Sequence, residues 1–298
     1  MKRKRTILAL LCMMTIAAFF SMNSEAKQKK IVELSENTAY TTYDITGDKK
    51  ADKIMIQRKT GSSVCKIFIN DKCCAKIKGK VECDYCDASI LSLNERTKFL
   101  YLVVGGFEEY GSGYEQIYQY VNGRLVKKLN PVKISEDLGI SYRPLVNKVT
   151  KDSVNMSLFC TTAEFGDIRF DVTYKYKNGV FKTSGKTYEI KKYVRTDGDW
   201  EEEGSDVLNT KEDRPYLTAS QTLQLYKSAL SNQKAFKIKE GTKLRLLKVR
   251  VGKKHNAYYI TTESGKKGWC VLPKKNDKPM VSDSYGEPDD SIWLKHLL

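Results

Sequence analysis

Short runs of alternating apolar and polar residues dominate the chain from about residue 32 to 190. Such alternation is typical of half-buried β-strands, because successive side chains of a strand point to opposite faces. Two of these runs contain Asn-Gly, which favours tight hairpins since both turn positions need positive φ. The pattern predicts strands at 53–57, 66–71, 98–104, 117–126, 154–159 and 172–181. We therefore expect an all-β fold.

The predicted hairpins recur along the sequence. Tyr-x-Tyr-x-Asn-Gly-x-Leu at 118–125 returns as Tyr-x-Tyr-x-Asn-Gly-x-Phe at 174–181, and Asn70-Asp71 precedes Asn122-Gly123 by 52 residues. A spacing near 50 residues with about four strands per unit is the size of a propeller blade. Three units are too few to close a propeller. We expect an antiparallel β-meander that is incomplete propeller-like or sandwich-like, and repeated hairpins in any antiparallel protein would give a similar pattern.

An acidic segment follows the predicted strands and differs from them in composition. Residues 196–218 contain eight acidic residues against Lys211 and Arg214. This composition predicts a solvated linker, the alternative being a segment that folds back on a basic face. The sequence thus divides into a β-rich repeat-like domain at 27–195, the linker at 196–218, and a small C-terminal domain with a tail at 219–298.

The first 26 residues have the pattern of a secretory signal peptide. A basic start at residues 2–5 precedes an apolar stretch at 7–20, and Ser24 and Ala26 are the small residues before a cleavage site. The alternative is an uncleaved N-terminal anchor. We expect a secreted, extracellular protein with no transmembrane anchor after signal cleavage.

The charge and the histidine content exclude several classes of catalytic site and indicate the kind of partner. Lys and Arg number 52 against 36 Asp and Glu, for a net charge of +16, and the only histidines are His255 and His296. Nothing before residue 255 can therefore be a Ser-His-Asp triad or a Cys-His pair. A lysine-rich exported protein suits an anionic wall polymer such as teichoic acid. No nucleic-acid-binding motif is present, so we expect no specific nucleic acid partner.

Seven of the eight cysteines follow the predicted signal peptide, and five of them fall between residues 65 and 86. A zinc site would suit Cys83-x-x-Cys86, but the adjacent Cys73 and Cys74 are badly spaced for it and no histidine is near. An odd number cannot all pair within one chain. We predict one or two disulfides plus free thiols, with the pairing left open.

Residues 43–54 resemble the calcium loop of FG-GAP or VCBS repeats, which occur in exported β-propeller proteins. The sequence there is Tyr-Asp-Ile-Thr-Gly-Asp-Lys-Lys-Ala-Asp-Lys-Ile. The resemblance implies a structural Ca²⁺ ion, because such a loop places carboxylates around a cation that prefers oxygen ligands. The implied metal ligands are Asp44, Thr46, Asp48, Lys50 through its carbonyl, and Asp52. The alternative is a carboxylate-capped turn that leads into a strand.

Residues 219–275 resemble a bacterial SH3-like domain. The matching segments are Leu223–Tyr226, Lys239–Leu247, Ala257–Thr261 and Ser264–Val271, the last close to the Gly-x-x-Gly-Trp-Val ending of that family. The resemblance implies a small β-barrel that contacts peptidoglycan or a peptide partner in the cell wall. The implied ligand-binding residues are Tyr226, Tyr258 and Trp269, but for Trp269 we favour a core position over a ligand contact.

The loop at 105–115 is the best enzymatic candidate. It combines Glu108, Glu109 and Glu115 with Tyr110 and Tyr114, and glycoside hydrolysis uses two carboxylates beside a sugar. Adjacent glutamates point apart on an extended chain, so we name no catalytic residue and keep Tyr110 and Tyr114 as secondary ligand contacts. We expect a non-catalytic cell-envelope binding protein that requires no cofactor. The alternative is a glycan-acting wall enzyme that uses this loop.

Overall fold

The protein is described by a computed structural model covering residues 29–59, 61–62, 64–78, 85–105, 114–193, 216–274 and 280–282. The predicted signal peptide, most of the acidic linker and the C-terminal tail lie outside these residues. Apart from the four-residue helix α2 (Lys133–Glu136), every described helix or strand is a β-strand, and all strand pairs are antiparallel. The prediction of an all-β fold is confirmed.

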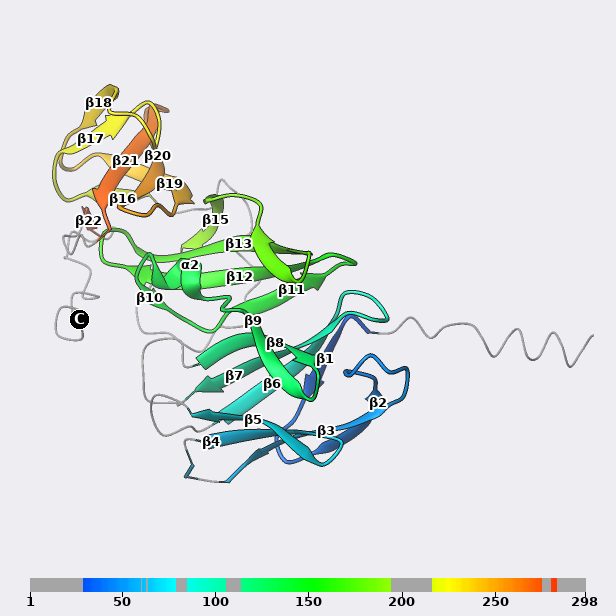
Figure 1. The fold of residues 1–298 in the computed structure, drawn as a ribbon. Helices are drawn as coiled ribbons and strands as arrows, with labels where there is room; N and C mark the ends of the chain where they lie inside the picture. The colour runs from blue at the N-terminus through cyan, green and yellow to red at the C-terminus, as the bar shows by residue number, and fades with distance from the viewer. Residues whose placement is uncertain are drawn as a thin grey trace, which may run out of the picture. The chain divides into compact units, whose positions relative to one another are not determined.

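The first sheet, which we call the N-terminal sheet, is a four-stranded meander (Figure 1). Its strands are β2 (Ala39–Tyr43), β3 (Asp52–Arg58), β4 (Val64–Ile69) and β5 (Lys72–Lys78). Alternate isoleucines of β3 and β4 are buried, as the sequence pattern predicts. One face of this sheet therefore packs into a core and the other faces outward.

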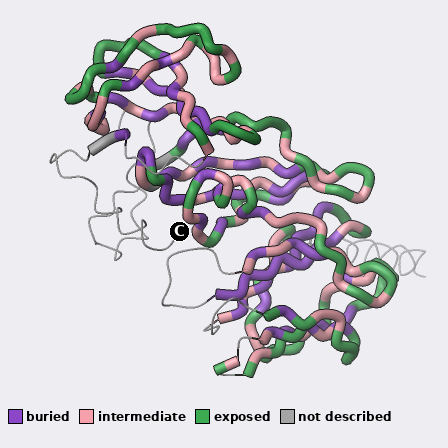
Figure 2. Tube along the Cα trace, turned by 60° about the vertical axis from the view of Figure 1, so that its left-hand side comes forward, coloured by how far each residue is buried: buried purple, intermediate pink, exposed green. Residues whose placement is uncertain are grey.

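The second sheet, the middle sheet, is buried on both faces along its central strand. Its strands, in order of pairing, are β1 (Ile31–Leu34), β6 (Tyr85–Ser92), β7 (Lys98–Gly105), β8 (Tyr114–Val121) and β9 (Arg124–Leu129). Every residue of β7 is buried. Leu100 and Leu102 join the core shared with the N-terminal sheet, whereas Phe99, Tyr101 and Val103 join a second core. The middle sheet thus lies between two hydrophobic layers, which appear as buried segments in Figure 2.

The third sheet, the long sheet, has 13 strands and packs against the second core. It begins with β10 (Ile140–Ser141), β11 (Leu145–Val149), β12 (Ser153–Thr162), β13 (Gly166–Lys177), β14 (Val180–Thr183) and β15 (Thr187–Tyr193). It continues with β16 (Leu217–Ala219), β17 (Leu223–Tyr226), β18 (Lys234–Ile238), β19 (Lys243–Arg250), β20 (His255–Thr262), β21 (Lys267–Pro273) and β22 (Val281–Ser282).

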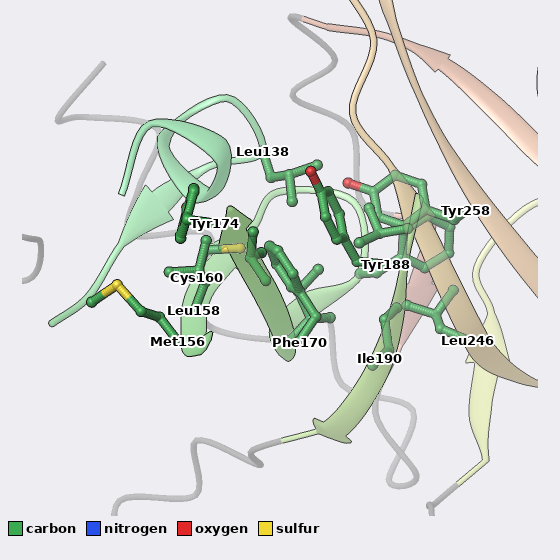
Figure 3. Packing of buried hydrophobic residues seen from close by; sticks show 14 of the residues in the cluster. Leu138, Met156, Leu158, Cys160, Phe170, Tyr174, Tyr188, Ile190, Leu246 and Tyr258 are labelled. Atoms are coloured by element: carbon green, nitrogen blue, oxygen red, sulfur yellow. The ribbon is translucent and has the colours of Figure 1, made fainter. Parts of the chain in front are cut away.

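The long sheet runs across the region where the sequence predicts a linker. Tyr188 of β15 is paired with Val249 of β19, so residues from both predicted domains share one hydrogen-bonded ladder. The core is continuous as well. Figure 3 shows Tyr188 and Tyr258 among the buried residues of this cluster, together with Leu158 and Phe170.

The expected closed C-terminal barrel is wrong: no described sheet closes on itself. The reason lies at β19. One edge of this strand pairs with β20. Its opposite edge pairs with β16 at residues 243–244 and with β15 at residues 248–250. Both edges of β19 are thus occupied, and no pairing among the described strands joins β18 to β19, so the strands after β19 continue the long sheet without a closed ring.

The predicted hairpin turns are present. Asn122-Gly123 joins β8 to β9, and Asn178-Gly179 joins β13 to β14, with φ between 48° and 81° at all four residues. Asn70-Asp71 joins β4 to β5 in the same left-handed conformation, with φ of 51° and 63°. Asn and Gly tolerate this backbone region better than other residues, which explains why these positions were recognisable in the sequence.

One disulfide joins two of the sheets. Cys65 of β4 and Cys86 of β6 are bonded and fully buried. The described cysteines without a disulfide are Cys73, Cys74, Cys160 and Cys270. This agrees with the prediction of one or two disulfides plus free thiols, while Cys83 lies outside the described residues. Burial raises the pKa of the Cys270 thiol to about 12, so this thiol stays protonated at neutral pH.

Asp137 connects α2 to the end of β21 and is expected to make stability depend on pH. Its carboxylate lies 3.2 Å from Lys133 Nζ and 2.8 Å from Lys274 Nζ. Burial acts to raise the pKa of Asp137, but hydrogen bonds from the two lysines outweigh it and lower the pKa below 3.8. A lowered pKa stabilises the folded state above the unfolded-state pKa, and this stabilisation is lost as pH falls through the folded-state pKa.

We therefore expect Asp137→Asn to be less stable than the wild type at pH 7 and to approach it at pH 2. Urea unfolding at several pH values between 7 and 2 measures this difference. Parallel pH profiles for the two proteins would contradict the assignment of these ion pairs.

Candidate functional site

A hollow of about 540 Å³ lies on the C-terminal part of the long sheet. Its floor is formed by Ala257 of β20 and by Val271 and Pro273 of β21. The loop 229–232 between β17 and β18 forms one wall, and the turn 252–254 between β19 and β20 contributes another. The size falls within the range of pockets that bind small ligands.

The turn beside the hollow depends on Gly252 and Asn256. A Cβ atom at Gly252 would lie 2.1 Å from the carbonyl oxygen of His255, so no other residue fits there without a shift of the backbone. Asn256 is buried and accepts a hydrogen bond from Gly252 N at 3.4 Å, and its amide donates to Asp137 O at 3.0 Å. This buried amide ties the turn to the loop after α2.

The hollow is strongly basic. The residues that line it include four cations and one histidine, and no acidic residue is among them. The basic residues are Lys186, Arg250, Lys253, Lys254 and His255. Concentrated charge of one sign around a concave surface attracts ligands of the opposite sign. The arrangement can therefore hold a carboxylate or phosphate group, with the apolar floor in contact with the rest of the ligand.

Three aromatic residues extend from the hollow along the outward face of the sheet. The strand register places Tyr226 beside Trp269 and Trp269 beside Tyr259. The rings of Tyr259 and Trp269 are 5.0 Å apart with a 40° tilt. Tyr226, Trp269 and Tyr259 are all partly exposed, and Tyr226 also lines the hollow. We call these three residues the aromatic ladder.

The structure places only two of the three aromatic residues predicted for this ligand site on the surface. Tyr258 is fully buried and donates a hydrogen bond to Glu164 at 3.4 Å, so it is a core residue in this conformation. Its neighbour Tyr259 takes the outward position. Strand alternation could have revealed this, because Ile260 and Leu246 belong to the same inward set as Tyr258. Burial, followed by the Glu164 carboxylate, raises the pKa of Tyr258.

The aspartates of the predicted calcium loop are engaged by the protein itself. Asp52 is 1% exposed and accepts hydrogen bonds from Ile45 N at 2.7 Å, Thr46 N at 2.9 Å and Asn70 Nδ2 at 2.7 Å. Asp44 accepts from Gly47 N and Lys49 N, and Asp48 accepts from Lys50 N.

Both oxygens of Asp44 and of Asp52, and Oδ1 of Asp48, accept hydrogen bonds from the protein. Within the described residues, no group of three His, Cys, Asp or Glu residues is placed to hold a metal ion. The hydrogen bonds of Asp44, Asp48 and Asp52 are those of a carboxylate-capped turn. A structural calcium ion with Asp44, Thr46, Asp48, Lys50 and Asp52 as ligands stays a prediction.

Asp52→Ala separates these two interpretations. We expect it to lower the free energy of unfolding by about 3 kcal/mol, because it removes the acceptor of two backbone N–H groups and one buried side-chain amide. Urea unfolding of the wild type and the variant, each in 1 mM CaCl₂ and in EDTA, measures the effect. The capped-turn interpretation predicts the same loss in both buffers. A wild type whose free energy of unfolding is higher in calcium than in EDTA would instead support the bound ion.

The second predicted contact region is described only in part. Tyr110 and the glutamates at 108 and 109 lie outside the described residues. Tyr114 is described and partly buried, its hydroxyl hydrogen-bonds that of Tyr118, and Lys127 Nζ lies 5.1 Å from the centre of its ring. Glu115 is 2% exposed and faces the core shared with the long sheet. These contacts place Tyr114 and Glu115 within the packing of the middle sheet.

Comparison with known proteins adds no relative. The chain matches no protein-family model, no curated protein and no solved structure. In the part of the chain that the structure describes, no helix has the length and apolar character needed to cross a membrane. Functional assignment therefore rests on the site itself.

Proposed function

We propose that this protein is an exported, non-catalytic binding protein of the bacterial cell envelope. In this proposal the hollow and the aromatic ladder contact peptidoglycan or a related anionic wall component. The observation that supports it best is the hollow itself, which is lined by four cations and a histidine without an acidic residue. The buried disulfide agrees with an oxidising compartment outside the cytoplasm.

The chemistry of the two neighbouring surfaces suits a peptidoglycan fragment. Peptide stems of such fragments carry carboxylates, which the cations of the hollow can bind by charge-assisted hydrogen bonds. Sugar rings present apolar faces that stack on aromatic side chains, and the aromatic ladder begins at Tyr226, where the hollow ends. One ligand can therefore place its charged group in the hollow and its sugar over Trp269.

The finer fold belongs to the same proposal. The N-terminal and middle sheets, followed by the first strands of the long sheet, are three successive antiparallel units, each containing one left-handed hairpin turn. We interpret them as propeller-like units, with sandwich-like packing as the alternative. We interpret the strands after residue 216 as an SH3-like module that opens onto the long sheet instead of closing on itself.

Reversing charge in the hollow tests the proposal. We expect the double variant Arg250→Glu and Lys254→Glu to bind solubilised peptidoglycan fragments at least tenfold more weakly in isothermal titration, because it replaces attraction by repulsion at the site. Tyr226→Ala should weaken binding to a smaller extent. The matched control is Lys148→Glu with Lys151→Glu, which changes the net charge equally at exposed positions of the long sheet away from the hollow.

Equal loss in the hollow variant and its control would show that only overall charge matters. The enzymatic alternative has a separate test. Glu108→Gln and Glu109→Gln should leave a binding protein unchanged, whereas they would abolish turnover of labelled cell wall if the loop at 105–115 were catalytic.

A further inference from the structure

The outward face of the N-terminal sheet is open and basic. We call it the basic face. Side chains that alternate with the buried isoleucines point away from the core and are exposed or partly exposed. Its residues are Lys53, Met55, Gln57, Val64, Lys66, Phe68, Cys73, Lys76 and Lys78. The opposite face of the same strands packs against the middle sheet.

Two lysines of this face lie directly opposite each other. The register pairs Lys66 of β4 with Lys76 of β5, and both are exposed. Lys78 follows two residues later on the same face, so the Cβ atoms of these lysines are about 5 to 8 Å apart. Like charges in directly opposed positions destabilise a sheet. The free protein therefore carries a repulsion that a bound anion would relieve.

Among the residues of β3, β4 and β5 that the structure describes, no acidic side chain compensates the pair. No acidic residue occupies an outward position of β3, β4 or β5, and the nearby Asp71 carboxylate already pairs with Lys53 at 2.7 Å. Another like-charge pair, Lys175 and Lys182 on β13 and β14, shares its face of the long sheet with Asp171. The basic face thus differs from a generally lysine-rich surface by its lack of acids.

The basic face offers few side chains that could insert into a lipid bilayer or stack on nucleic acid bases. The large hydrophobic residues that are strongly exposed in the described chain are Val121, Val126, Leu145, Val180 and Leu230, and none lies on β2 to β5. Interfacial membrane binding needs such residues for insertion. Stacking of successive nucleic acid bases needs several aromatic rings, whereas Phe68 is the single aromatic residue of the basic face as defined above.

From these observations we infer that the basic face binds a linear phosphodiester polymer of the teichoic-acid type, with successive phosphates against Lys66, Lys76 and Lys78. Regularly repeated anions on a flexible chain match closely spaced lysines on a flat sheet. Binding of this kind releases counterions and so weakens with salt. This inference goes beyond the proposed function, because it concerns a different sheet and stands whether or not the hollow binds peptidoglycan.

Lys76→Glu in the full chain should change stability and binding in opposite directions. It converts a repulsive pair into an attractive one, so we expect the melting temperature to rise by about 2 °C. Affinity for lipid-free poly(glycerol phosphate) should fall about tenfold at low salt, since one contact is lost and one repulsion is added. Lys76→Gln should also raise the melting temperature and lower the polymer affinity, each by a smaller amount. It replaces Lys76→Glu in the experiment if the glutamate variant folds poorly.

The matched control is Lys175→Glu. It makes the same change in net charge and removes the same kind of repulsive pair, opposite Lys182. We expect a similar rise in melting temperature and an affinity for the polymer within twofold of the wild type. The double variant Arg250→Glu with Lys254→Glu should keep the polymer affinity that Lys76→Glu lowers. This variant separates failure of the present inference from failure of the peptidoglycan site.

Wild-type affinity in Lys76→Glu, or equal loss in Lys76→Glu and Lys175→Glu, would overturn the inference. Vesicles containing phosphatidylglycerol provide the other source of phosphodiester groups. If Lys76→Glu lost binding to vesicles but kept binding to the polymer, the face would be a membrane contact and the inference would be wrong.

Discussion

Phe99→Ala is expected to lower the free energy of unfolding by about 4 kcal/mol, within the range measured for truncation of buried aromatic residues. Phe99 is fully buried, and its ring centre lies 4.9 Å from those of both Tyr176 and Phe181. Truncation would leave a cavity between the middle sheet and the long sheet. The neighbouring rings belong to a strand and its hairpin partner, which limits how far they can move to fill it.

Urea unfolding of the wild type and Phe99→Ala measures this loss. Val121→Ala is the matched control, because Val121 is a hydrophobic residue of the middle sheet that is 37% exposed, and its truncation should cost less than 1 kcal/mol. A loss below 1 kcal/mol for Phe99→Ala would contradict the packing of the two sheets through β7.

Removal of the disulfide is the second large effect. We expect the double variant Cys65→Ala and Cys86→Ala to lose about 3 kcal/mol of stability, which is the loop-closure entropy predicted for a loop of this length. The cysteines are 21 residues apart in the sequence and connect the N-terminal sheet to the middle sheet. Without the bond, the unfolded chain gains freedom and the two sheets are held by packing alone.

Reduction of the wild type should reproduce this loss, whereas Cys73→Ser should change stability little because Cys73 is exposed and carries no disulfide. Peptide mapping under non-reducing conditions checks the pairing directly. Recovery of Cys65 linked to any cysteine other than Cys86 would be inconsistent with the fold described above.

Local features of the fold could be predicted from the sequence. The Asn-Gly turns at 122–123 and 178–179 were recognisable because few residues accept positive φ. The alternation of isoleucines in β3 and β4 identified the buried face. Each of these signals lies within about ten residues of the chain, where backbone preference and side-chain periodicity act directly.

Long-range pairings could not be predicted in the same way. The ladder between β15 and β19 joins residues about 60 positions apart, and no local pattern marks Tyr188 and Val249 as neighbours. The pairing of Cys65 with Cys86 was equally undetermined, since several cysteines lie within the same short stretch and spacing alone does not choose among them.

The candidate site was predicted in part. Tyr226 and Trp269 lie on the outward face, although a core position was favoured for Trp269, whereas Tyr258 is buried and Tyr259 takes the outward position. The basic hollow had no signature in the sequence, because its lining comes from β17, β19, β20, β21 and the loops around residues 186, 230 and 253. Its charge could be identified only once folding brought these segments together.

Co-sedimentation with purified bacterial sacculi, stripped of teichoic acid, tests the central claim most directly. The comparison uses the mature full chain and the Arg250→Glu, Lys254→Glu variant at low and high salt. A truncation before residue 216 is unsuitable, because it would remove the strand that pairs with β15 and part of the shared core. The proposed function predicts that the wild type sediments at both salt concentrations and that the variant stays in solution. Equal sedimentation of both proteins, or loss of wild-type binding at high salt, would contradict it.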